Sequence, residues 1–149
     1  MNKWVIALLI AALLALFTLA IAFPPVPVDD PIAAAKELLV KNDIPVPPYT
    51  IEVVHSRPST ANVDVAAWVY SGTHVIFILD TTPTWKDAKA GDEGALEVLA
   101  AMIVHEGVHA SGDMSENDAY DAEIAALEKM GADHALVEGV ERAKEDALR

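Results

Sequence analysis

The hydropathy pattern divides the chain into an apolar leader and a longer remainder of mixed polarity. From Trp4 to Phe23 the sequence reads WVIALLIAALLALFTLAIAF, and Thr18 is its only polar residue. Because this run has no polar face at any helical period, it does not match a helix that packs on a soluble core. Its length is sufficient to cross a bilayer as a helix. The pattern therefore predicts a membrane-engaging leader over residues 1–23.

The leader fits two kinds of membrane segment. As a secretory signal peptide, it has Lys3 as its basic start and Ala20-Ile21-Ala22 as a cleavage site before Phe23. As an uncleaved transmembrane anchor, it explains why the apolar run is longer than that of a usual signal peptide. In both cases Lys3 stays on the cytoplasmic side and the acidic remainder follows to the outside. We therefore expect an exported domain that is either secreted or anchored in a membrane.

The residues after the leader predict a spacer and then the first helix of a domain. Residues 24–30 are rich in proline, a composition typical of an extended, semi-rigid spacer. Asp30 followed by Pro31 is typical of a helix N-cap and first turn. An apolar stripe then predicts a helix from Pro31 to about Lys41. The domain is therefore expected to span residues 31–149.

Three β-rich segments follow this helix. Alternating and β-branched residues predict strands over Tyr49–His55, Val65–Tyr70 and His74–Asp80. The second and third segments flank Ser71-Gly72-Thr73, a spacing that is typical of a β-hairpin. The sequence therefore predicts one isolated strand and one hairpin.

The second half of the chain is predicted to be mainly helical. Residues 81–94 contain Pro83, Gly91 and Gly94 and are expected to be mostly irregular. Apolar residues then recur at helical spacing in three segments, Glu93 to Ala110, the Ser115 cap to about Met130, and Ala132 to Leu148. The order is one helix, three strands and three helices. It indicates an α+β fold with a small antiparallel or mixed sheet packed against helices on one side.

Composition removes several classes of function. The chain has no cysteine, which excludes a disulfide scaffold and thiolate metal sites. Its formal net charge is −13, whereas a nucleic-acid-binding protein needs a basic face to neutralise phosphate. We therefore expect no nucleic-acid partner. The length of 149 residues, with the leader set aside, suffices for one modest hydrophobic core.

A motif in the predicted helix Glu93–Ala110 indicates a metal site. His105-Glu106-Gly107-Val108-His109 matches H-E-x-x-H, and residues at i and i+4 share one helix face, so both imidazoles reach one ion. Zinc binds neutral histidine nitrogen and prefers four ligands. Glu106 lies one position round the helix, where it reaches a water on the metal and acts as general base. Average composition gives one chance match in about 300 chains of this length.

Gly107 lies at the middle of this motif and is unusual in a helix. A glycine inside a helix is about 1 kcal/mol less favourable than an alanine. We therefore expect a specific reason for Gly107, either a close packing neighbour or room for a ligand.

The motif and the helix after it resemble the zincin metallopeptidases, in particular the gluzincin branch. In those families a second helix supplies a glutamate ligand, often in an E-x-x-A pattern, and Glu116-Asn117-Asp118-Ala119 has this pattern. The resemblance covers roughly residues 74–130. It implies that His105, His109 and Glu116 bind Zn²⁺ and that the chain hydrolyses peptide bonds.

Helix geometry leaves other third ligands open. If the two helices form a tight antiparallel hairpin, the histidines lie opposite about residue 120, and Glu116, Tyr120 and Glu123 share the facing side. Glu123 is then the alternative third ligand, and Asp113 and Asp118 are further candidates. In this geometry Tyr120 points at the metal or its substrate, which makes it a second candidate catalytic residue that stabilises an oxyanion.

Supporting residues around the site are also predicted. The resemblance implies an Asp or Asn that supports a histidine ligand, and because Tyr120 stands at that position, the role passes to Asp121 or Asp118. His134 is a further oxyanion candidate, although its place in the last helix favours a surface residue. His55 has no partner that the sequence identifies.

The strand before the motif helix is a candidate for substrate binding. In zincins this strand often forms the edge along which a peptide substrate lies, adding to the sheet by backbone hydrogen bonds. If Val75–Leu79 is that edge, His74 or Asp80 borders the cleft. A core strand with a solvated His74 is the simpler expectation.

Together these observations predict an exported zinc metallopeptidase with His105, His109 and Glu116 as ligands and Glu106 as general base and later general acid. Its partners would be a peptide or protein substrate and, through an uncleaved leader, a membrane. The alternative is a catalytically inactive zincin-like binding or structural module tethered to a membrane. Glu106 separates the two hypotheses, because a structural metal site needs ligands but no general base.

Overall fold

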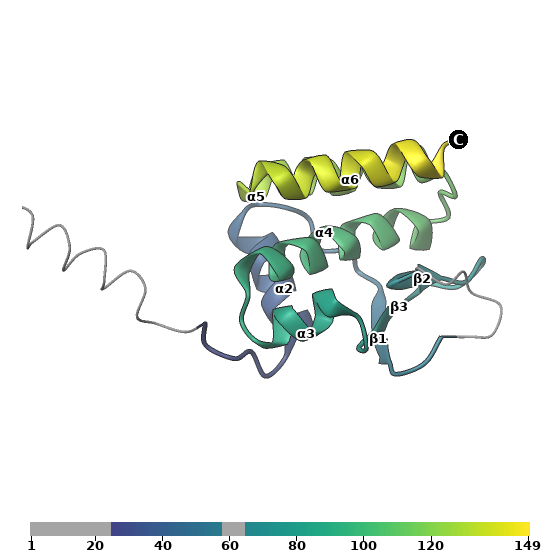
Figure 1. Ribbon diagram of the computed structural model, residues 1–149. Helices are drawn as coiled ribbons and strands as arrows, with labels where there is room; N and C mark the ends of the chain where they lie inside the picture. The colour runs from purple at the N-terminus through teal and green to yellow at the C-terminus, as the bar shows by residue number, and fades with distance from the viewer. Residues whose placement is uncertain (1–24, 58–64) are drawn as a thin grey trace, which may run out of the picture.

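The computed structural model describes residues 25–57 and 65–149 (Figure 1). The helices and strands in these ranges are, in chain order, α2 (Pro31–Lys41), β1 (Thr50–Val54), β2 (Ala67–Val69), β3 (Val75–Leu79), α3 (Pro83–Lys89), α4 (Glu93–Ala110), α5 (Glu116–Met130) and α6 (His134–Ala147). The predicted leader over residues 1–23 lies outside the described residues. No helix within the two described ranges combines the length and apolar character that a membrane span requires.

The helix boundaries are set by capping groups that the sequence shows. The Asp30 carboxylate accepts hydrogen bonds from the backbone N–H groups of Ile32 and Ala33, and Pro31 occupies the first turn. The Ser115 hydroxyl accepts one from the N–H of Asp118, which begins α5. Gly131 ends α5 with φ of 77°, a left-handed conformation in which a side chain is unfavourable. These caps confirm the predicted ends of α2 and α5.

The prediction of mostly irregular structure over residues 81–94 is wrong. The segment contains α3, whose N-cap is Thr82, and the Thr82 hydroxyl accepts a hydrogen bond from the N–H of Trp85. Pro83 does not break this helix, because a proline in the first turn needs no hydrogen-bonded N–H. Ala88 is fully buried, and α3 packs on α4. The same residues that indicated a loop therefore delimit a short helix.

The three strands form one mixed sheet in the order β1-β3-β2. β2 and β3 are antiparallel, with Trp68 opposite Phe77, which confirms the predicted hairpin. β1 is parallel to β3, with Ile51 opposite Ile76. β3 is thus the central strand, which agrees with the simpler expectation of a core strand and rules out the alternative that Val75–Leu79 is a substrate-binding edge. The parallel partner of β3 is distant in sequence, so the hairpin pattern did not show it.

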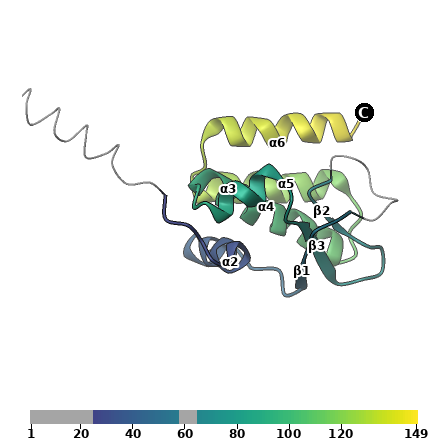
Figure 2. The same ribbon diagram turned by 60° about the horizontal axis from the view of Figure 1, so that its bottom comes forward.

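The hydrophobic core lies between the sheet and α4, which is at the centre of the helical layers (Figures 1 and 2). α2, α3 and α5 all pack against α4, and β2 and β3 contact it as well. The largest fully buried side chains come from α4 itself and from α2, β3 and α5 around it, and they are Leu39, Ile76, Ile78, Leu99, Ile103 and Leu127. The fold is therefore the predicted α+β class, a three-stranded mixed sheet packed against helices.

α6 packs on α5 and forms the outer layer of the molecule (Figure 2). Among the apolar residues that recur at helical spacing in this segment, Val137 is buried and Leu136 and Val140 are half-buried. Ala143, however, is exposed. The second half of α6 therefore extends past the core, toward the end of the molecule that carries the sheet (Figure 1).

Candidate metal centre

The H-E-x-x-H motif lies in the last turns of α4 and is buried. His105, Glu106 and His109 are only 8%, 7% and 9% exposed. The helix begins at the Asp92 cap, whose carboxylate accepts a hydrogen bond from the N–H of Ala95. Its apolar first half is held by the core, so the three polar side chains are carried on a rigid support.

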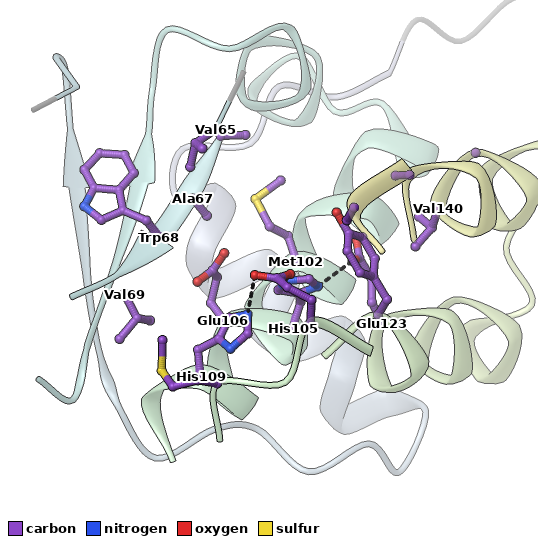
Figure 3. Close-up of a pocket in the computed structure, with 17 residues that line it drawn as sticks. Val65, Ala67, Trp68, Val69, Met102, His105, Glu106, His109, Glu123 and Val140 are labelled. Carbon is purple, nitrogen blue, oxygen red and sulfur yellow. Dashed lines mark hydrogen bonds and ion pairs between the residues drawn. The ribbon is translucent and has the colours of Figure 1, made fainter. Parts of the chain in front are cut away.

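The two histidines turn the same ring nitrogen toward one carboxylate (Figure 3). The Nε2 atoms of His105 and His109 each lie 3.6 Å from an oxygen of Glu116, one from Oε2 and the other from Oε1. One ligand atom from each residue lies within 4.8 Å of the others. The structure thus brings together the three predicted ligands in a His/His/Glu group that could hold a metal ion.

The other ring nitrogen of each histidine has a different partner. Nδ1 of His105 lies 2.9 Å from Oε2 of Glu123, and Nδ1 of His109 lies 2.9 Å from the carbonyl oxygen of Asp113. Both partners accept, so each Nδ1 donates and each neutral imidazole keeps its lone pair on Nε2. Metal-bound histidines commonly have their second nitrogen held in this way. The donor set and its supports therefore fit a zinc ion.

Glu123 is placed as a support for His105 rather than beside Nε2. It is 9% exposed and lies on the opposite side of the imidazole from Glu116. The predicted support by Asp121 or Asp118 is wrong: the Asp121 carboxylate pairs with Lys144, and Asp118 is exposed. The sequence contains one indication that Glu123 supports His105: its i+7 spacing from Glu116 places both residues on one face of α5.

The other candidates for the third ligand do not join the group. The Asp113 carboxylate accepts a hydrogen bond from the N–H of Ser115, while its backbone carbonyl is the group that supports His109. Tyr120 packs its ring edge-on against His105, with the centroids 4.7 Å apart. Burial, with Glu123 as the next cause, raises the pKa of the Tyr120 hydroxyl. This keeps the phenol protonated and able to donate; its oxyanion role stays a prediction.

Burial dominates the electrostatics of the motif. It raises the pKa of Glu106 to about 7, while the neighbouring histidines oppose this shift. Burial, the largest single cause, lowers the pKa of His105, but the hydrogen bond to Glu123 and the nearby glutamate charges together outweigh burial and raise it. Glu106 is therefore a buried carboxyl group whose pKa lies near neutral pH, as a group that acts as general base and then as general acid requires.

The group opens into a cleft of about 660 Å³. Val65, Ala67 and Val69 of the β2 segment lie on one side of the histidines and Val140 of α6 lies on the other (Figure 3). Sequence reasoning missed this role of β2 and α6. The lining comes from five segments, namely residues 65–69, Met102 with the motif side chains, Met114, the inner face of α5, and Gly139, Val140, Ala143 and Ala147.

The remaining histidines lie away from the cleft. Nδ1 of His74 donates to the carbonyl oxygen of Ala110, 2.7 Å away, and so fixes the end of α4. His55 pairs with Asp80, at 2.9 Å, between the ends of β1 and β3. His134 is an exposed residue near Glu138. Neither His74 nor Asp80 lines the cleft, and His74 is exposed, in agreement with the simpler expectation for this strand.

Comparison with protein-family models, with curated proteins and with solved structures finds no match to this chain. The functional argument therefore depends on the geometry of the site.

Proposed function

We propose that this chain is a zinc-dependent metallopeptidase of zincin type. The observation that carries the proposal is the orientation of the donor set: His105 and His109 turn Nε2 toward the Glu116 carboxylate while their Nδ1 atoms are held by other groups. In this proposal these three residues hold the metal. A bound zinc ion lowers the pKa of a water molecule and polarises a carbonyl group.

Glu106 moves the proton in the proposed reaction. Its carboxylate takes a proton as the water oxygen bonds to the scissile carbonyl carbon. The same carboxyl then gives that proton to the leaving nitrogen as the C–N bond breaks, so the products are a carboxylate and an amine. Burial beside the histidines and a pKa of about 7 support both steps, since the group can change protonation state near neutral pH.

β2 supports the proposal by offering a backbone edge at the site. It pairs with β3 on one side only, within the described residues, and residues 65–69 line the cleft. An extended peptide that adds to the free side of β2 gains main-chain hydrogen bonds independent of its sequence. Such a peptide would pass Glu106, which lies between the histidines and β2 (Figure 3).

The test combines metal content with hydrolysis for the purified chain and three variants. We expect the wild-type chain to bind about one zinc ion and to cleave peptides from a mixed library. Glu106→Gln should keep the metal and lose hydrolysis by about 10²- to 10⁴-fold. His109→Ala should lose both. Glu128→Gln, an exposed glutamate on α5, is the matched control and should change neither.

Two results would overturn the proposal. Equal hydrolysis by wild type and Glu106→Gln would remove the catalytic role of that carboxylate. Bound zinc without any hydrolysis would favour the alternative, a zincin-like module in which the metal only joins α4 to α5.

A further inference from the structure

The cleft has two chemically different parts. Its walls are apolar: Val65 and Val69 come from the β2 side, Met102 from α4, and Val140 from α6. Its floor is acidic, because Glu106, Glu116 and Glu123 all line it. An apolar wall favours apolar ligand groups, and a carboxylate-lined concave surface favours cationic ones.

No lysine or arginine lines the cleft among the described residues. The basic side chains of α6 have acidic neighbours: Lys144 pairs with Asp121, and Arg142 and Arg149 lie near glutamates or an aspartate of the same helix. In the sequence, residues 58–64, which precede the β2 wall, read PSTANVD and contain no basic residue. Apart from the proposed metal ion, the described lining of the cleft therefore has no lysine or arginine that can neutralise a ligand carboxylate.

The second half of α6 is a wall of this cleft rather than part of the core. Gly139, Ala143 and Ala147 follow one another at i, i+4 and i+8 and all line the cleft. Ala143 and Ala147 are exposed, so their small side chains leave space between α6 and β2. That space accommodates the side chains of an extended segment whose backbone lies on β2.

Building on the proposed function, we propose that the substrate is an internal segment of a cationic polypeptide, with apolar side chains beside the scissile bond. The reaction is the hydrolysis described above, so the chain acts as an endopeptidase. A carboxypeptidase needs a cation for the terminal carboxylate of its substrate, since a desolvated carboxylate without a partner is strongly unfavourable. Apart from the proposed metal ion, which polarises the scissile carbonyl, the described cleft lining offers none.

Charge outside the cleft acts in the same direction. The chain has a net charge of −13, and the exposed residues Asp113 and Asp118 flank the cleft-lining residues Met114 and Glu116 in sequence. A cleft of one sign concentrates ligands of the opposite sign and speeds their association, and this effect falls with ionic strength. Lysine or arginine beside the apolar centre of a substrate should therefore raise the association rate.

The experiment uses internally quenched peptides with one apolar centre and flanks of Lys, Gln or Glu. With both termini blocked, we expect kcat/KM to decrease in the order Lys, Gln, Glu, with roughly tenfold or more between the extremes at low salt. The ratio should shrink several-fold between about 20 mM and about 500 mM NaCl, because the Debye length falls to a few ångströms. Replacing the blocked C-terminus by a free carboxylate should not raise cleavage.

A pair of double variants tests the source of the charge preference. Asp113→Asn with Asp118→Asn should lower the Lys-to-Glu ratio by about twofold or more, and because both rates come from the same variant, the ratio does not depend on its overall activity. Asparagine at residue 113 keeps the side-chain oxygen that accepts from Ser115. Asp43→Asn with Asp87→Asn removes the same charge at residues that do not line the cleft, and should leave the ratio unchanged.

Binding to the metal-free chain gives a readout that is independent of catalysis. Fluorescence anisotropy with dye-labelled versions of the three peptides, in chelator, should rank affinity in the same order, Lys above Gln above Glu. Three outcomes would overturn the substrate assignment without affecting the proposed peptidase function. They are equal affinity and equal cleavage of the three peptides, a preference for Glu flanks, and a requirement for a free C-terminal carboxylate. If zinc-loaded protein cleaves no peptide yet binds the Lys-flanked one best, the proposed peptidase function fails and the ligand preference stands.

Discussion

The two halves of α4 are buried to a similar extent for opposite reasons. In the first half, Leu99 and Ile103 are at most 1% exposed and belong to the hydrophobic core. In the second half, His105, Glu106 and His109 are at most 9% exposed and are polar. Burial of apolar surface stabilises by about 25 cal/mol per Å², whereas burial of an ionisable group is unfavourable unless it is paired. One helix therefore joins a stabilising half to a functional half that reduces stability.

The comparison teaches how the fold supports the site. The second half remains ordered because the first half is fixed in the core and because each histidine Nδ1 has an acceptor. His74, just before β3, also donates a hydrogen bond to the carbonyl oxygen of Ala110, the last residue of the helix. Substitutions in the two halves should therefore separate stability from function.

The largest effect should come from the core half. Ile103→Ala removes a fully buried side chain, and we expect a loss of about 2–5 kcal/mol in the free energy of unfolding, through lost burial and the cavity that remains. Denaturant unfolding measures this value. Val40→Ala is the control, because Val40 is 65% exposed and should change stability by about 0.5 kcal/mol or less. Equal losses for the two variants would contradict the assignment of the core to α4.

The functional half should give the metal-free chain an unusual pH dependence. The folded-state pKa of Glu106 is about 7, above its unfolded value of 4.5, so the folded chain holds a proton that the unfolded chain releases in this window. Stability is thus fully present below pH 4.5 and falls as pH rises through 7, by up to about 3 kcal/mol. The raised pKa values of His105 and Glu97 contribute with the same sign.

Denaturant unfolding in chelator between pH 5 and 8 measures this slope. Glu106→Gln should reduce the slope without abolishing it, because Glu97 and His105 remain. Zinc should reverse the trend, since metal binding requires deprotonated ligands and so strengthens as pH rises. An identical slope in wild type and Glu106→Gln would show that this carboxyl does not hold its proton in the folded state.

The support of His105 should be measurable as metal affinity. Glu123→Gln keeps the size of the side chain but removes its negative charge, so it weakens the hydrogen bond that Nδ1 of His105 donates. We expect zinc affinity to fall by roughly 10- to 100-fold, as for other residues that orient metal-bound histidines. Competition with a chromophoric chelator measures it. Complete loss of binding would indicate instead that Glu123 is itself a ligand, the alternative that helix geometry left open.

Local signals sufficed to predict much of this molecule. The helix over residues 93–110 has the boundaries expected, because its Asp92 cap and Ser111 end are encoded within a few residues. The hairpin was likewise readable from Gly72 and the flanking β-rich segments. The His/His/Glu group was predicted because i, i+4 spacing fixes the two histidines, and the structure brings Glu116 to them. Its role as a metal ligand stays a prediction.

The parts that could not be predicted depend on contacts between distant residues. Glu116 and Glu123 share one face of α5, and only the depth at which α5 packs on α4 decides which of them meets Nε2. The parallel pairing of β1 with β3 makes β3 the central strand and leaves β2 at one edge of the sheet, and the hairpin pattern alone does not show this pairing. Ala143 fits an apolar helical stripe, yet that part of α6 faces the cleft instead of the core.

Two helical glycines provide the smallest and sharpest test. At Gly107 an added Cβ would lie 2.5 Å from Cγ of Pro47, a stiff ring, and such a close packing neighbour is one of the two reasons that the sequence left open. The overpacking should outweigh the gain in helix propensity, so we expect Gly107→Ala to lose about 1 kcal/mol in the free energy of unfolding. At Gly139 an added Cβ meets nothing within 4 Å. Gly139→Ala should therefore gain about 0.5–1 kcal/mol.

Thermal and denaturant unfolding of both variants measure the difference, and a Pro47→Ala background adds a direct check. Removing the Pro47 ring should relieve most of the loss at Gly107 and leave the gain at Gly139 unchanged, because only contacting residues couple. A gain in stability for Gly107→Ala alone would mean that Pro47 yields easily and that packing does not require this glycine. The remaining explanation would then be space for a ligand beside the motif, which would make Gly107 a functional requirement and not a packing requirement.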